Sequence, residues 1–132
     1  MEKLTARLRE QILASAPKEP DEAVGATIGL WEALAARLVP IIGDDGFRSL
    51  LDRSLHLTSK CFPWLAMDLS VWDHSDRFSG LRDNLNSRSA VEAAAAGLAL
   101  LTTFVATLVE LIDEPLVSDM LNSAWGNPVV QR

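Results

Sequence analysis

Apolar residues recur every three or four positions along most of the chain, which is the spacing of one face of an α-helix. In the first segment, 2–16, this stripe consists of Leu4, Leu8 and Ile12, and two prolines then interrupt the pattern. We find no run in which polar and apolar residues alternate, as they would in a half-buried strand. The pattern therefore predicts an all-α protein.

Two further segments carry longer apolar stripes and are expected to be the core helices. The first begins near Asp21, and Pro40 should kink or end it, with Gly43 as a left-handed cap before a third helix over 46–60. The second, 88–113, is apolar on more than one side, which is typical of a central helix. The stripes are Val24, Ile28, Trp31, Ala35, Leu38 and Ile42 in the first segment, and Val91, Ala94, Leu98, Leu101, Val105, Leu108 and Ile112, flanked by Leu100, Phe104 and Leu111, in the second.

The remaining segments complete a prediction of six helices in one domain over residues 1–132. Residues 61–75 are irregular and rich in aromatic residues, so we expect a packed connection there. A helix should start near residue 76, and Asp113-Glu114-Pro115 should open a last helix that ends near Trp125.

An internal similarity suggests that the chain is duplicated. Shifting the sequence by 70 positions aligns 22–55 with 92–125 without a gap, and the helix breaks near Gly43 and Asp113 coincide. We therefore predict two pseudo-symmetric three-helix units, about 2–60 and about 76–125, packed around the two long helices. Similar composition alone would explain part of this match. The identical pairs are Glu22/Glu92, Ala23/Ala93, Ala26/Ala96, Leu30/Leu100, Ala36/Ala106, Leu38/Leu108, Val39/Val109, Ile42/Ile112 and Leu51/Leu121.

Composition and charge narrow the possible partners. The 132 residues are 48% hydrophobic and 23% charged, with 12 basic and 18 acidic residues and a net charge of −6. Nucleic-acid binding requires a basic surface, so we expect none. The single cysteine, Cys61, forms no disulfide within the chain and is expected to be buried. The start of the chain lacks the apolar run of a signal peptide, and we therefore expect a cytoplasmic protein.

Membrane insertion is the alternative interpretation of the most apolar helix. Residues 93–109 carry no charge, but this stretch is at the short end of the length that spans a bilayer, about 17–25 residues. Threonines dilute it and its downstream flank is acidic rather than basic. We therefore expect a buried helix and no membrane.

Candidate chemistry is sparse. His74 lies among acidic residues, including Asp73 and Asp76, but their spacing matches no metal-ligand pattern and helix capping explains the carboxylates. His56 is expected at the surface. There is no nucleophile motif and no glycine-rich phosphate loop. The sequence therefore predicts no catalytic residue, metal or cofactor.

Two sets of residues are candidate binding sites. Trp64, Met67 and Trp72 in the connection form either a plug over the bundle or a contact patch for another protein. We therefore predict a non-catalytic interaction, adaptor or regulatory module of bacterial type that self-associates. The alternative is a small-molecule sensor with an apolar cavity between the two units, near Thr103, Phe104 and Thr107, although such threonines also bond to their own helix.

Three glycines fall inside predicted helices. Glycine in a helix costs roughly 0.5–1 kcal/mol relative to alanine, so a steric reason is expected at Gly25, Gly29 and Gly97. Close approach of a neighbouring helix would supply that reason.

Overall fold

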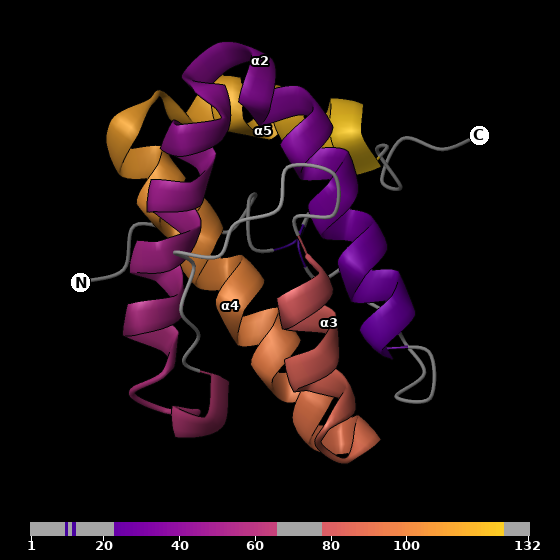
Figure 1. Ribbon diagram of the computed structural model, residues 1–132. Helices are drawn as coiled ribbons and strands as arrows, with labels where there is room; N and C mark the ends of the chain where they lie inside the picture. The colour runs from indigo at the N-terminus through magenta and orange to yellow at the C-terminus, as the bar shows by residue number, and fades with distance from the viewer. Residues whose placement is uncertain (1–9, 11, 13–22, 66–77, 126–132) are drawn as a thin grey trace.

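A computed structural model describes residues 10, 12, 23–65 and 78–125. In these parts of the chain the regular structure is helical and contains no strand, which confirms the all-α prediction. The elements are α2 (Ala23–Thr58), the short 3₁₀ helix η2 (Pro63–Leu65), α3 (Ser79–Asn86), α4 (Ala90–Leu111) and α5 (Glu114–Trp125). Figure 1 shows α2 folded back on itself in front of α4, with α5 crossing behind its bend.

The prediction of six helices is wrong, because the described residues form four α-helices. α2 consists of two helical arms that meet at a kink, because Gly43 itself has non-helical φ and ψ, so the break expected there is present although no loop separates the arms. Gly43 has φ 84° and ψ 162°, a conformation open almost only to glycine, so a single residue reverses the chain without a loop. Pro40 lies inside the helix and does not end it. The segment predicted as the first helix lies outside the described residues, except for Glu10 and the buried Ile12.

The two predicted three-helix units are wrong together with the six-helix count. Whether 22–55 and 92–125 are copies of one sequence is not tested by this architecture and stays a prediction. The chain leaves helical geometry at Gly43 in α2 and at Ile112 after α4, close to the shared break in the alignment. The first break keeps both arms in one element, whereas the second separates α4 from α5. The single-domain assignment is likewise a prediction.

The centre of the core is an aromatic cluster of Trp31, Phe47, Phe78 and Phe104, all of which are buried. Trp31 and Phe104 meet edge to face with ring centroids 4.9 Å apart, and Phe47 lies 5.3 Å from Phe104. Phe78 lies 6.0 Å from both Trp31 and Phe47 and closes the ring of contacts. The cluster therefore joins both arms of α2 to α4 and to the start of α3. Among the described residues no acceptor lies within hydrogen-bond distance of the buried indole N–H of Trp31.

The predicted core stripes are confirmed in the middle of the long helices and fail at their ends. In α4, Leu101, Val105 and Leu108 are buried, whereas Val91 and Leu111 are exposed. Ser89 caps the start of α4 by accepting a hydrogen bond from the backbone N–H of Glu92.

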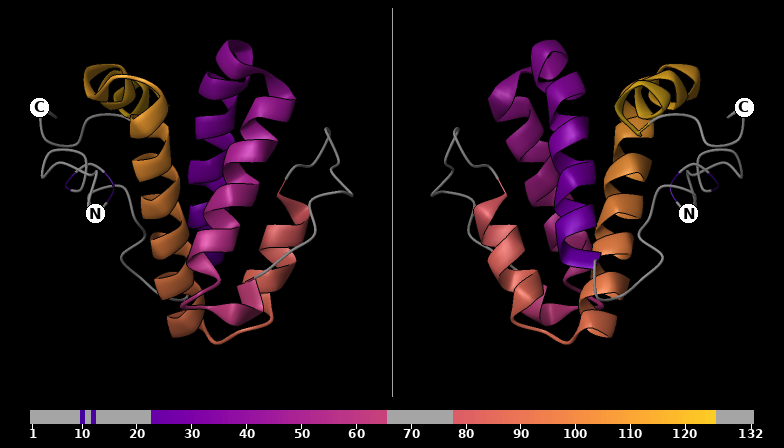
Figure 2. Two further views of the ribbon diagram at one scale, coloured as in Figure 1. Left: turned by 90° about the vertical axis from the view of Figure 1, so that its left-hand side faces the viewer. Right: turned by 90° about the vertical axis from the view of Figure 1, so that its right-hand side faces the viewer.

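Long-range contacts fix the shorter helices against α2. The indole Nε1 of Trp125, the last residue of α5, donates a hydrogen bond to the carbonyl of Leu30 at 3.0 Å. Arg82 of α3 lies 3.9 Å from Glu32 of α2 in an exposed ion pair. The side views in Figure 2 show α4 and α3 on opposite sides of the two arms of α2.

Candidate functional site

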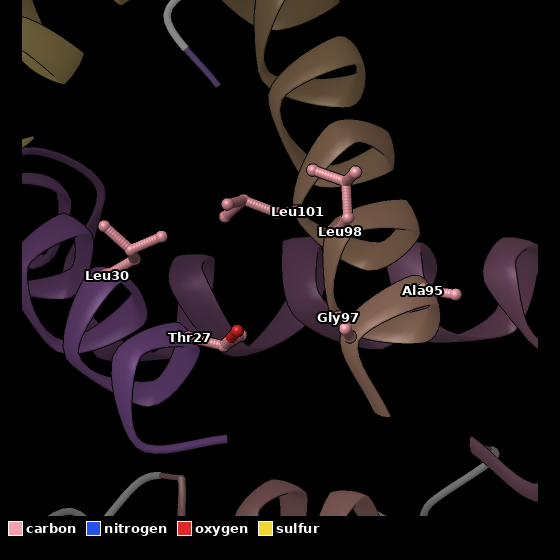
Figure 3. Close-up of a pocket in the computed structure, with 7 residues that line it drawn as sticks. Thr27, Leu30, Ala95, Gly97, Leu98 and Leu101 are labelled. Atoms are coloured by element: carbon pink, nitrogen blue, oxygen red, sulfur yellow. The ribbon is translucent and has the colours of Figure 1, made fainter. Parts of the chain in front are cut away.

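A cavity of about 220 Å³ lies between the first arm of α2 and the first half of α4. Figure 3 shows Leu101 of α4 extending toward Leu30 of α2, with Thr27 and Gly97 beside them. Leu30 and Leu98 are half-buried, so the cavity opens to solvent. Its lining residues are Thr27, Leu30, Ala94, Ala95, Gly97, Leu98 and Leu101.

One end of the cavity is set by the close approach of the two helices at Gly97. A Cβ atom added there would lie 3.3 Å from Cγ2 and 3.4 Å from Oγ1 of Thr27, which is tighter than ordinary van der Waals contact. Gly97 is therefore the glycine with the expected steric reason. At Gly25 and Gly29 an added Cβ would meet nothing within 4 Å, so the same expectation is wrong there.

The lining suits an uncharged, apolar group. Among the lining residues only Thr27 carries a side-chain hydrogen-bonding group, and none is charged. A dry apolar cavity of about 150 Å³ already binds benzene in another helical protein. A compact apolar molecule or a single apolar side chain would therefore fit this space.

The residues predicted to line a ligand cavity lie further along α4. The hydroxyl of Thr103 donates to the carbonyl of Ala99 at 2.9 Å, and that of Thr107 donates to the carbonyl of Thr103 at 2.9 Å. Phe104 is fully buried in the aromatic cluster. The two threonines therefore bond to their own helix, which was the alternative considered, and Phe104 packs in the core. None of the three side chains lines the cavity. The sequence predicts the close approach of a neighbouring helix at Gly97, but it does not connect that approach with a cavity.

Trp64 is half-buried at the base of the molecule, in the predicted partner patch. It packs edge to face on Phe62 with ring centroids 6.3 Å apart, and the guanidinium of Arg88 lies 5.0 Å from the centre of its ring. Such a cation–π contact holds one face of the indole. Met67 and Trp72, the other members of the patch, lie outside the described residues, as do Asp73, His74 and Asp76.

The far end of the molecule exposes three large apolar side chains, here called the apolar end: Ile41, Leu111 and Leu116. Their exposed fractions are 64%, 65% and 54%. Figures 1 and 2 both place the bend of α2, the end of α4 and the start of α5 at this end. Ile41 and Leu111 are aligned with each other in the predicted duplication. Sequence reasoning placed Leu111 on a buried face and did not single out this surface.

The described residues show no clustered chemistry that would suggest catalysis. They contain no group of three or more His, Cys, Asp or Glu side chains placed to hold a metal ion. His56 is exposed, as expected, but Cys61 is exposed and not buried as predicted.

Comparison with protein families, curated proteins and solved structures finds no match to this chain.

Within the described part of the chain, two helices are long and apolar enough to cross a membrane by length and composition, over Val24–Thr58 and Ala90–Leu111. The buried share of the most apolar window is 33% in the first and 44% in the second. Buried core helices of water-soluble proteins meet the same criterion, so this finding leaves membrane association open.

Proposed function

We propose that this chain is a non-catalytic helical module that binds another protein through its apolar end. The observation that supports this function is the exposure of Ile41, Leu111 and Leu116, which belong to the bend of α2, the end of α4 and the first turns of α5. Figure 1 places these three segments at one end of the molecule. Isolated exposed leucines are common on protein surfaces, whereas grouped ones characterise contact surfaces. An adaptor or regulator needs such a surface and needs no catalytic group.

The experiment is site-specific photo-crosslinking in the cells that naturally express the chain. A photoreactive phenylalanine analogue placed at Leu116 should yield a discrete crosslinked protein, which a Leu111→Ser change should abolish. The matched control carries the analogue at Val91, which is 69% exposed at the opposite end of α4. No crosslink at Leu116, or the same crosslinks from both positions, would contradict the proposal.

Self-association is the second part of the sequence-based hypothesis. Sedimentation of the purified chain should show a concentration-dependent dimer if copies associate. A dimer that survives the Leu111→Ser and Leu116→Ser changes would use a surface other than the apolar end.

A small-molecule sensor is the second candidate function, and the cavity between α2 and α4 is the observation that favours it. Native mass spectrometry of the freshly purified chain should then detect a bound apolar compound. Replacing Ala94 by leucine should displace this compound by filling the cavity, whereas Ala36→Leu, on an exposed part of α2, should leave it bound.

A cytoplasmic, water-soluble location is part of this proposal. Glu32, which pairs with Arg82 of α3, and the kink at Gly43 both fall inside the first candidate span, where a lipid-facing helix would disfavour them. Recovery of the chain from lysed cells without detergent would support this location, and recovery only from the membrane fraction would contradict it.

A further inference from the structure

The charge around the apolar end is one-sided. Residues 89–125, which contain α4 and α5, include no lysine, arginine or histidine. Their acidic residues are Glu92, Glu110, Asp113, Glu114 and Asp119. Four of these five fall between positions 110 and 119, in the same turns as Leu111 and Leu116.

The residues at the bend of α2 do not offset the negative charge of α4 and α5. Asp44 and Asp45 lie there with Arg37 and Arg48, so that segment is neutral. Arg48 also lies 3.8 Å from Asp45. Taking residues 36–48 and 108–120 together, six acidic and two basic side chains give a net charge of −4 at this end.

We propose that the apolar end binds a basic amphipathic helix of another protein, an inference that rests on the proposed function. An amphipathic helix places an apolar stripe against exposed apolar side chains and keeps its charged face at the rim of the contact. Here Ile41, Leu111 and Leu116 supply the apolar contact. Glu110, Asp113 and Asp119 are exposed residues near Leu111 and Leu116 in the sequence, and their carboxylates would complement lysine or arginine side chains of the partner.

The same charge disfavours other occupants of this surface. Two copies that met symmetrically through the apolar end would bring two acidic rims together, which destabilises the contact. Anionic membranes and nucleic acids would be repelled for the same reason. A basic amphipathic helix complements both the apolar side chains and the carboxylates.

The test uses three fluorescent peptides of about 18 residues, or about five helical turns. The first has a leucine stripe and lysines elsewhere, the second replaces every lysine by glutamate, and the third replaces every leucine by serine. Fluorescence anisotropy at low salt should show saturable binding of the first peptide. The second and third should bind at least about tenfold more weakly, and added salt should weaken binding of the first.

Paired variants of the protein assign the binding to this surface. Leu111→Ser with Leu116→Ser should abolish binding of the lysine peptide, and Glu110→Gln with Asp119→Asn should weaken it severalfold and reduce its dependence on salt. Val91→Ser and Glu92→Gln make the same kinds of change at the other end of α4 and should leave the affinity unchanged. Circular dichroism should show the same helicity in all four proteins.

The outcomes separate this inference from the proposed function. If crosslinking at Leu116 succeeds while the lysine peptide does not bind, or binds no better than the glutamate peptide, the basic-helix inference is wrong and the interaction function stands. Absence of the crosslink contradicts the interaction function. Binding of the chain to vesicles of phosphatidylcholine and phosphatidylglycerol, lost with Leu111→Ser and Leu116→Ser, would identify the surface as a membrane contact and overturn the inference.

Discussion

The aromatic cluster and the apolar end both include apolar side chains of α2 and α4, yet those of the cluster are buried and those of the apolar end are exposed. Phe104 and Leu111 lie seven residues apart, which places them on the same face of α4 two turns from each other. Phe104 is fully buried, and Leu111 is 65% exposed. At Phe104 the rings of Trp31 and Phe47 cover the helix face, whereas at Leu111 the helix is about to end.

This difference shows that an apolar stripe identifies which face of a helix is buried. It does not show how many turns of that face the neighbouring helices cover. The extent depends on which neighbouring helices reach each turn. Exposed residues at the end of such a stripe are therefore candidates for contact with other molecules. The following predictions test that distinction, beginning with the largest expected effect.

Replacing Phe104 by alanine should destabilise the fold by about 3–5 kcal/mol, because it removes a fully buried ring and leaves a cavity beside Trp31 and Phe47. Urea unfolding followed by circular dichroism measures this change. The matched control, Leu111→Ala on the same helix face, should alter stability by no more than about 0.5 kcal/mol. Equal losses from the two variants would mean that Leu111 is as well covered as Phe104.

Replacing Gly43 by alanine should cost about 1–3 kcal/mol, because a side chain disfavours the φ of 84° that bends α2 and carries Ile41 to the apolar end. Thermal unfolding of this variant, set against Gly25→Ala in the first arm of α2, isolates the effect of the bend. If the two variants unfold alike, the left-handed geometry at Gly43 is not required.

The smallest expected effect is the difference between two glycine-to-alanine changes, one at a glycine with free space around an added Cβ atom and one at a glycine packed against a neighbouring helix. Gly29→Ala should stabilise the fold by roughly 0.5–1 kcal/mol, since alanine favours the helix and nothing lies within 4 Å of the added Cβ. Gly97→Ala should gain less or lose stability, because its Cβ would lie 3.3 Å from Thr27 Cγ2. Denaturant midpoints of the two variants measure the difference, and a larger gain at Gly97 would contradict the close helix approach described there.

Local signals in the sequence predicted much of the helical structure. The stripe containing Trp31 and Leu38 marked a buried face, and Asp113-Glu114-Pro115 marked the start of α5. The number of helices was not obtained in this way, because the sequence marks a break at Gly43 but does not show that the second arm of α2 follows it without a loop. The apolar end was missed for a related reason. The spacing of apolar residues does not show that the neighbouring helices no longer cover α4 at Leu111. The cavity depends on a spacing between α2 and α4 that is a tertiary property.

The hydrogen bond from Trp125 to the carbonyl of Leu30 joins positions 95 residues apart, near the two limits of the described fold. Closing a loop of that length costs more chain entropy than forming the local contacts within α2 or between α3 and α4. Docking of α5 should accordingly be a late event in folding, and its amide protons should exchange with solvent faster than those of the middle of α4. Because α5 starts at the apolar end, a bound partner that holds this helix in place would slow that exchange and raise the stability of the whole chain.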